Sequence, residues 1–388
     1  MSKKRCVLFA ALEMSYWCFH ASFIGYAAAY LLAQGVSNTA VSLLLAGYML
    51  LGFIGSLAAG NACDRFRTNK KVFMLCMLMA YGLMFALYFR GAEVAVAALC
   101  YPLLGFFFLP QGANIDSWLL DACARDQRIF GRIRCMPSLA YAVVCALFGQ
   151  LIARFGYHVM IPGATFFFAV TMASAALLPD AKREAAAEKK KASAGDVGRL
   201  FAAAPYRRLV VLLFLLGLAT APMNNLKIVV LESVGGNVSH VGVDAFVGAM
   251  TQVPFIAMAA LIHRLPLRVR FLSMSFLLML MPLTASFAVS PAMVYLASFF
   301  YNVGYGILLT TMRDVTELHV DRDIRNLGHT LSDAVFTSFS GVISLMYAGA
   351  LTDALGVRAM LAVCAAICAV PVVISLLPQR VSDRKSLR

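Results

Sequence analysis

The residues of this chain best suited to chemistry are ionisable and amide side chains placed deep inside long apolar stretches. Most of them fall on the first, fourth, seventh and tenth stretches: Glu13, His20, Gln111, Asn114, Asp116, Asn224, Asn225, Lys227, Arg313, Asp314 and Glu317. A charge at bilayer depth costs roughly 2.5–3.5 kcal/mol on insertion scales, so such residues should face other helices or a water-filled cavity. A polar lining that returns on every third stretch predicts two related bundles of six helices around one central cavity, an arrangement typical of transporters.

The elements that position these residues are predicted to be transmembrane helices. The chain is 61% hydrophobic and 13% charged, whereas soluble proteins carry about 25% charged residues. Its 388 residues can hold about twelve spans of about 20 residues with short connections. We expect an all-α membrane protein of twelve helices, because lipid leaves the backbone few other choices. The predicted spans are 6–33, 39–61, 71–90, 94–122, 132–153, 158–178, 207–232, 242–262, 270–288, 292–318, 327–352 and 358–378.

Lys and Arg are divided unequally between the connections. Of the 33, 28 lie in the termini and alternate connections that would share one side, three lie on the other side, and two lie inside spans. The positive-inside rule therefore predicts a multi-pass protein of the cytoplasmic (inner) membrane with both termini in the cytoplasm. The net charge of +14 then reflects topology rather than nucleic-acid binding. The first apolar stretch is too long for a signal peptide, and we expect it to stay uncleaved.

A basic segment divides six spans from six. We expect an N-terminal bundle over 1–178, a cytoplasmic linker over 179–206 and a C-terminal bundle over 207–388. The sequence GQLIARFGYHVM from Gly149 is partly repeated as GALTDALGVRAM from Gly349, with both glycines coinciding. Repeated halves related by an axis along the membrane normal are common in transporters.

The connection between the second and third spans carries a motif that runs from Gly60 to Lys71, GNACDRFRTNKK. It resembles the cytoplasmic loop motif of the major facilitator superfamily, and this resemblance covers the whole chain. The matching positions are Gly60, Asp64, Arg65 and Lys70, whereas Arg67 stands where the family usually has glycine. The resemblance implies the major facilitator fold, and it implies that the matching residues latch the cytoplasmic side.

Two further residues are assigned to the cytoplasmic gate. Arg313 and Glu317 lie near the inner end of the tenth span. Their i, i+4 spacing allows them to pair within one helix. The alternative is an ordinary interfacial pair without a gating role.

A second motif runs from the fourth into the fifth span. Asp116 is followed after thirteen residues by the sequence FGRIR, which ends at Arg134, and Tyr141 lies seven residues further on. This pattern is similar to that of the lactose permease branch, the oligosaccharide and nucleoside proton symporters. The resemblance implies that Asp116 and Arg134 bind solute hydroxyls and that Tyr141 stacks on a sugar ring. The alternative is an ion pair that only fixes helix packing.

The chain also departs from this branch. Pro137 replaces a usual glycine, and neutral Gln252 stands where relatives often carry Glu before Val-Pro. The tenth span has no His and Glu three residues apart at mid-depth, which is the proton-coupling arrangement of lactose permease. The solute site is therefore matched more clearly than the coupling machinery.

The remaining candidates come from the first and seventh spans. Glu13 and His20 are seven residues apart on one helix face, and both side chain types can hold a proton near neutral pH when suitably placed. The alternative for His20 is a packing residue. Asn224 and Lys227 could bind solute from the second bundle together with Gln252, or Lys227 could simply extend its ammonium group to the outer interface. The sequence leaves open which of three polar residues in the fourth span faces the cavity: Asn114, Asp116 or Asp121.

These features predict a secondary active transporter, most simply a proton symporter for a sugar, oligosaccharide or nucleoside. The alternative is a drug/proton antiporter of the same fold. The expected partners are a small solute, protons and the lipid bilayer, with no nucleic acid, and the protein is expected to be a monomer. An enzyme is disfavoured because the chain has no Gly-rich nucleotide loop, HExxH sequence or nucleophile motif. The ten cysteines include no CxxC pair, so we expect neither a metal site nor a cofactor.

Overall fold

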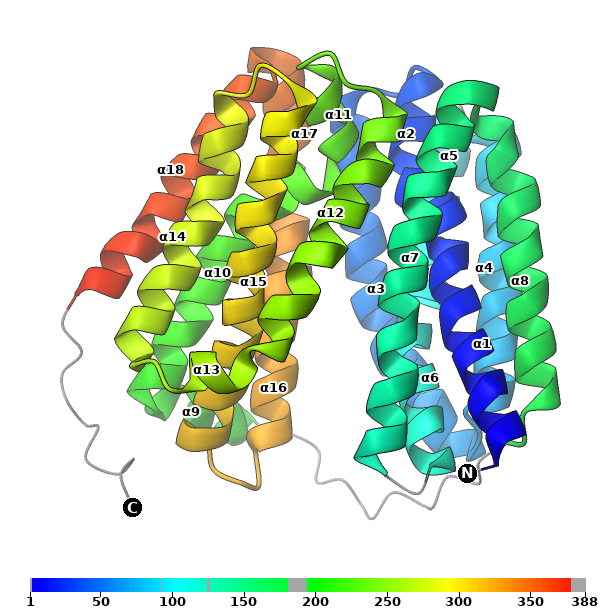
Figure 1. The fold of residues 1–388 in the computed structure, drawn as a ribbon, viewed down its shortest axis with the longest axis horizontal. Coiled ribbons are helices and arrows are strands. Elements are labelled where there is room, and N and C mark those ends of the chain that lie inside the picture. Colours follow the sequence, from blue (N-terminus) through cyan, green and yellow to red (C-terminus); the bar gives the residue numbers. More distant parts are fainter. Residues whose placement is uncertain (1, 92, 124–125, 181–193, 378–388) are drawn as a thin grey trace.

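The computed structural model describes residues 2–91, 93–123, 126–180 and 194–377, which are helical almost throughout. The helices form two groups that stand side by side (Figure 1). The first group contains α1 (Lys3–Phe19), a π-helical turn (His20–Ile24), α2 (Gly25–Ala33), α3 (Asn38–Phe66), α4 (Lys70–Arg90), α5 (Val94–Phe108), α6 (Pro110–Ala122), α7 (Gln127–Phe155), a 3-10 turn (Tyr157–Val159) and α8 (Met160–Leu177). The second contains α9 (Ala194–Ala202), α10 (Ala204–Asn225), α11 (Lys227–Glu232), α12 (Val238–Ala257), α13 (Ala259–His263), α14 (Leu267–Ser286), α15 (Pro291–His319), α16 (Arg325–Ala334), a π-helical turn (Val335–Phe339), α17 (Ser340–Leu355) and α18 (Val357–Leu376).

Eleven helical segments within the described ranges are long and apolar enough to cross a membrane. They coincide with the predicted spans except the eighth, 242–262, whose place is held by α12 and the short helix α13. The predicted all-helical membrane fold is confirmed. Residues 181–193 of the predicted linker lie outside the described residues, and α9 occupies part of its remainder.

Several spans are interrupted, and the interruptions have local causes. The clearest separates α10 from α11, where Leu226 leaves the helical conformation at φ −102° and ψ 30°. Pro222 lies four residues earlier and has no N–H to donate to the carbonyl of Leu218. The Tyr347 hydroxyl of α17 takes this place and donates to the Leu218 oxygen at 3.0 Å. The seventh span is therefore a broken helix whose freed carbonyl is satisfied by a neighbouring helix.

The two groups contact each other mainly through α3 with α17 and through α7 with α12. These contacts include the end of the molecule that carries the 34–37 and 356 connections, which we call the outer end. There the Asp353 carboxylate accepts hydrogen bonds from Asn38 Nδ2 and from the backbone N–H of Thr39, both at 2.8 Å. The second contact places a carboxylate on the first turn of α3, which favours negative charge.

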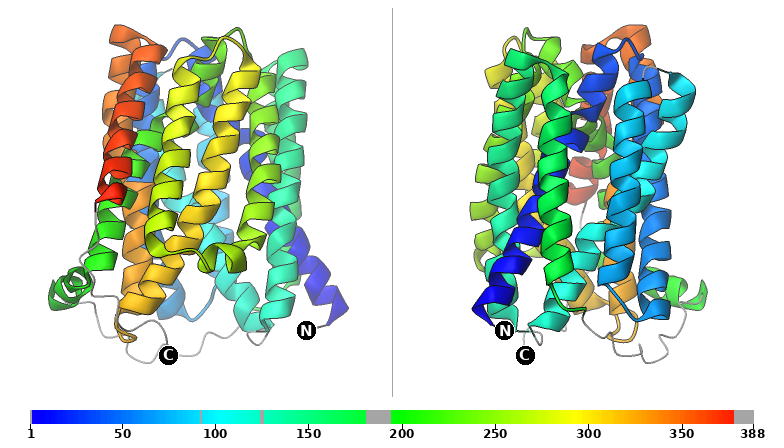
Figure 2. Two further views of the ribbon diagram at one scale, coloured as in Figure 1. Left: turned by 60° about the vertical axis from the view of Figure 1, so that its left-hand side comes forward. Right: turned by 90° about the vertical axis from the view of Figure 1, so that its right-hand side faces the viewer.

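Small residues allow α7 and α12 to approach each other closely. A Cβ on Gly242 of α12 would lie 2.4 Å from the carbonyl oxygen of Cys145 in α7. Toward the opposite end, which carries the N-terminus, the ribbons of the two groups diverge (Figures 1 and 2). The outer end is thus the closed end of the pair of bundles.

Candidate substrate site

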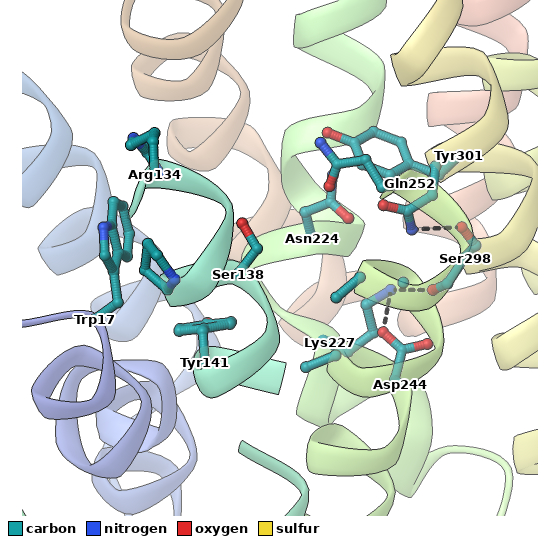
Figure 3. A pocket seen from close by; sticks show the side chains of 15 residues that line it. Trp17, Arg134, Ser138, Tyr141, Asn224, Lys227, Asp244, Gln252, Ser298 and Tyr301 are labelled. Carbon is teal, nitrogen blue, oxygen red and sulfur yellow. Dashed lines mark hydrogen bonds and ion pairs between the residues drawn. The ribbon is translucent and has the colours of Figure 1, made fainter. Parts of the chain in front are cut away.

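A cavity of about 370 Å³ lies between the two groups of helices. Figure 3 shows charged and aromatic side chains facing it from both sides. Five of the predicted binding residues line it: Arg134, Tyr141, Asn224, Lys227 and Gln252. It is also lined by residues that the sequence analysis did not select, chiefly Trp17, Ser138, Asp244, Ser298, Tyr301 and Asn302. The structure therefore brings together side chains from five separate spans.

The first group contributes the ion pair of Asp116 on α6 with Arg134 on α7. Arg134 Nε lies 2.9 Å from Asp116 Oδ1, and the two side chains are 36% and 29% exposed. Both side chains are therefore partly exposed, although Asp116 Oδ1 itself is buried. Asp116 is not part of the cavity lining and acts on the cavity through Arg134.

The other two polar candidates of the fourth span point elsewhere. Asn114 is buried and donates to Gln111 Oε1 at 3.2 Å and to the Asn69 carbonyl at 3.3 Å. Asp121 is exposed. Of the three alternatives that the sequence left open, Asp116 is the one connected to the cavity.

An aromatic surface adjoins Arg134. The guanidinium carbon lies 5.9 Å from the centre of the Trp17 ring, a distance at which the ring face attracts a cation. The rings of Trp17 and Tyr141 meet edge to face with their centres 6.3 Å apart. Sequence reasoning missed Trp17, although its i+4 spacing from Glu13 placed it on the candidate face of the first span. The first span thus supplies an indole ring beside Tyr141.

The second group contributes a more deeply buried pair, Lys227 with Asp244. Lys227 is the first residue of α11, directly after the break in the seventh span. Its Nζ lies 3.1 Å from Asp244 Oδ2 and donates to Ser298 Oγ at 2.7 Å. The two side chains are only 10% and 9% exposed. The alternative of a Lys227 side chain that extends to the outer interface is therefore wrong.

Sequence reasoning missed Asp244 because it falls near the start of the predicted eighth span. Close to the membrane surface a carboxylate adds little to the free energy of insertion, so it did not stand out. One signal could have found it. A lysine inside the membrane needs an acidic partner, and Asp244 lies on the helix that follows Lys227 in the chain.

The two proton-coupling candidates have different surroundings. Glu13 is fully buried beside Asp116 and Trp17. Asp116 and Arg134 are close enough to act on its charge. His20 begins the π-helical turn and packs against the rings of Phe108 and Tyr141, each with centres 5.6 Å apart. Glu13 therefore adjoins the charged part of the site, whereas His20 adjoins its aromatic part.

The predicted pairing of Arg313 with Glu317 is wrong. Glu317 instead pairs with Arg325 at 2.8 Å and with His329 at 3.1 Å, both on α16. Arg313 is exposed and lines a separate hollow of about 1070 Å³ in the second group. Helical spacing made the pair possible, but the following helix brings two competing partners to the carboxylate.

The loop that contains the predicted latch residues keeps the geometry expected of a glycine. Arg67 has φ 50° and ψ 39°, the left-handed conformation, which costs a residue with a Cβ roughly 1–2 kcal/mol. Lys70 Nζ donates to the carbonyls of Ala176 and Leu178, both at 2.7 Å, and so caps the end of α8. Gly60 and Arg65 are exposed, and Asp64 is half-buried beside them. The loop is thus joined to its own group of helices through Lys70.

Potential metal ligands are scattered. Within the described ranges, no group of three or more His, Cys, Asp or Glu side chains is placed to hold a metal ion.

A family model described as the MFS_1 like family matches residues 9–363. The chain therefore belongs to this family of major facilitator transporters, which are not enzymes, and the predicted superfamily is confirmed.

Individual relatives are more distant. The chain is 23% identical over 252 residues to the "Probable 3-phenylpropionic acid transporter" of Escherichia coli (strain K12), a match that covers 64% of this chain and 65% of that protein. A crystal structure of a variant of the nucleoside transporter NupG has a TM-score of 0.82 at 14% identity and covers 96% of this chain and 98% of that one. The human organic anion transporter MFSD10 has a TM-score of 0.60 at 14% identity, with coverage of 97% and 100%. At these identities the structural matches establish the fold alone.

Proposed function

We propose that the protein carries a small polar solute across the cytoplasmic membrane by alternating access, in symport with protons and as a monomer. The observation that carries this proposal is the cavity between the two groups of helices, which each group supplies with one ion pair. A site shared by two bundles can open to either side when the bundles rock against each other. We further propose that both termini are cytoplasmic, in line with the distribution of Lys and Arg.

The cavity favours a solute with one ring and several polar groups. Its volume of about 370 Å³ lies at the small end of the range for ligand pockets, about 300–1,000 Å³. This size favours a monosaccharide or nucleoside over a long oligosaccharide. Trp17 and Tyr141 offer ring faces and edges, and Arg134, Asn224 and Gln252 offer directed hydrogen bonds. The names of two relatives, a nucleoside transporter and a phenylpropionic acid transporter, also describe ring compounds with polar groups.

The arrangement of the bundles corresponds to an inward-facing state under this proposal. The outer end is closed by the Asp353 carboxylate of α17, which accepts a hydrogen bond from the first turn of α3, and by the close approach of α7 to α12. The diverging end carries the N-terminus, which we place in the cytoplasm. Solute would therefore exchange with the cytoplasm in this conformation.

The test is a binding screen on the purified protein. Thermal unfolding would be followed in the presence of monosaccharides, nucleosides, aromatic carboxylates and cationic dyes, since a ligand that binds the folded state raises the Tm. A nucleoside or sugar should raise the Tm of the wild type but not of Arg134→Ala. Arg154→Ala is the matched control, because Arg154 is exposed at the end of α7, away from the cavity. Stabilisation by cationic dyes alone, unchanged in Arg134→Ala, would instead support the drug antiporter.

Proton coupling is tested separately in proteoliposomes. Glu13 is the leading carboxylate in the first group, because it is fully buried and adjoins Asp116. Uptake of the solute found in the screen should rise with an inward proton gradient and fall when the gradient is collapsed. Uptake that is unchanged by both treatments would contradict proton coupling, but it would still be consistent with solute transport.

A further inference from the structure

The cluster of Lys227, Asp244 and Ser298, which lines the cavity, contains an unused hydrogen-bonding position. One carboxylate oxygen of Asp244 faces the Lys227 ammonium at 3.1 Å. The other, Oδ1, is buried and has no hydrogen-bond partner among the described residues. A buried oxygen without a partner is rare in folded proteins and calls for an explanation.

The ammonium group is incompletely used as well. It has three N–H donors, of which one is directed to Ser298 Oγ at 2.7 Å and one to Asp244. Both side chains line the cavity. Their low exposure, 10% and 9%, means that each depends on the other for charge neutralisation rather than on water.

We propose that Asp244 is a proton-carrying residue of the transport cycle and that Lys227 alternates between Asp244 and the solute. This inference rests on the proposed function as a proton-coupled transporter. In the empty site the Asp244 carboxylate neutralises Lys227. One proton then binds Asp244 Oδ1 and makes the carboxyl group neutral, which leaves the Lys227 ammonium free to donate to a solute oxygen.

The cycle closes with the same atoms. When the solute leaves, Lys227 returns to Asp244, and the proton leaves Oδ1 for the cytoplasm. No bond other than the O–H bond forms or breaks, and Asp244 carries one proton in each cycle. Because an unprotonated Asp244 holds Lys227, solute binding requires the proton to bind first.

The surroundings of Asp244 suit this role. Lys227 on α11 contacts it, and Tyr295 on α15 lies close enough to interact with its charge. Ser298 on α15 and, across the cavity, Arg134 and Tyr141 on α7 line the same cavity, and His240 lies one turn earlier on α12. Lys227 is the single strong cation in direct contact with the carboxylate, within the part of the chain that the structure describes. It also starts the six-residue helix α11 after the break at Leu226, a place where the backbone can shift without bending a continuous helix.

The first test needs no solute. Infrared difference spectra of the purified protein between alkaline and acidic pH report the carbonyl stretch of each carboxyl group that takes up a proton. We expect a band that is lost in Asp244→Asn, retained in Asp116→Asn, and restored with an altered pH dependence in Asp244→Glu. An Asp244→Asn spectrum identical to that of the wild type would overturn the inference, whatever the cargo. If Asp244→Asn does not fold, the Asp244→Glu spectrum decides in the same way.

The second test uses proteoliposomes and the solute identified by the thermal screen. Asp244→Asn imitates the protonated residue, so it should still exchange internal for external solute but should no longer accumulate it against a gradient. Its affinity for the solute should also become independent of pH. Accumulation at the wild-type level by Asp244→Asn would overturn the inference. A protein that binds none of the solutes would contradict the proposed function, and the infrared result would still decide the role of Asp244.

Discussion

The two ion pairs at the cavity each join an aspartate to a basic residue, Arg134 in one and Lys227 in the other, but they differ in their exposure. Asp116 and Arg134 are 29% and 36% exposed, whereas Asp244 and Lys227 are 9% and 10% exposed. When one partner of an exposed pair turns to a ligand, little free energy of interaction is lost, because water solvates the remaining charge. A buried pair cannot separate unless its charge is compensated. The first pair is therefore suited to bind solute directly, and the second is suited to a step in which a proton replaces the missing charge.

The largest expected effect comes from removing one partner of the buried pair. Lys227→Met leaves Asp244 buried without a cation, and breaking a buried pair in this way costs about 3–5 kcal/mol of folding free energy. We expect a clear fall in Tm at neutral pH. The double variant Lys227→Met/Asp244→Asn should recover much of it, because no charge is then left unpaired. A double variant that is no more stable than the single one would show that the two residues do not act as a pair.

Arg134→Met is the corresponding change in the exposed pair and should affect binding more than stability. Its folding cost should stay well below that of Lys227→Met, because solvent can reach the remaining Asp116 carboxylate. Loss of hydrogen bonds from a charged donor costs about 1.5–3 kcal/mol of binding, so we expect solute affinity to fall roughly 10-fold to 150-fold. Equilibrium binding and thermal unfolding of both variants would test the contrast. Equal losses of Tm in the two would remove the distinction between the pairs.

Arg134→Lys separates the charge of this residue from the geometry of its hydrogen-bond donors. Lysine keeps the charge but not the planar fork of donors that suits paired oxygens. We expect the ion pair with Asp116 to survive, with an unchanged Tm and a roughly 10-fold weaker affinity, as for one lost charge-assisted hydrogen bond. Full affinity in Arg134→Lys would indicate that the site uses only the charge of this residue.

The contact at the outer end should shift the conformation with little effect on binding. Asp353→Ala removes the acceptor for Asn38 and Thr39 and so weakens closure of the outer end. Spin labels on the outer ends of α3 and α17 should then show a larger population at long distance. An unchanged distance distribution would mean that the close packing of α7 with α12 suffices to hold this end closed.

The smallest effect is expected at the loop after α15. The guanidinium of Arg199 on α9 contacts Asp321 and Asp323, both at 2.8 Å, and all three side chains are well exposed. Its hydrogen bond lowers the pKa of Asp323. The stabilisation is therefore present above the unfolded pKa of about 4 and is lost as the pH falls through the lowered value. Arg199→Ala should leave Tm and uptake unchanged at neutral pH, and a strong loss of either would assign α9 a larger role.

The spans could be predicted because a bilayer demands about 20 consecutive apolar residues, which the sequence displays directly. Arg134 and Tyr141 could be selected because a local motif and one helix face join them. Asp244 was missed because no local motif marks it, and only its place on the helix that follows Lys227 pointed to it as a partner. The pairing of Arg313 with Glu317 was wrong for a related reason, because spacing along one helix does not reveal the residues that the next helix brings near.

The hydroxyl group of Tyr347 links two distant regions through one rigid element. It donates a hydrogen bond to the carbonyl of Leu218, which Pro222 leaves free. This carbonyl lies in α10, two turns before the break that precedes Lys227. Six residues after Tyr347 on α17, about 9 Å along the axis, Asp353 closes the outer end. We therefore expect a tilt of α17 that releases Asp353 to displace the contact with Leu218 as well, which would couple opening of the outer end to the position of Lys227.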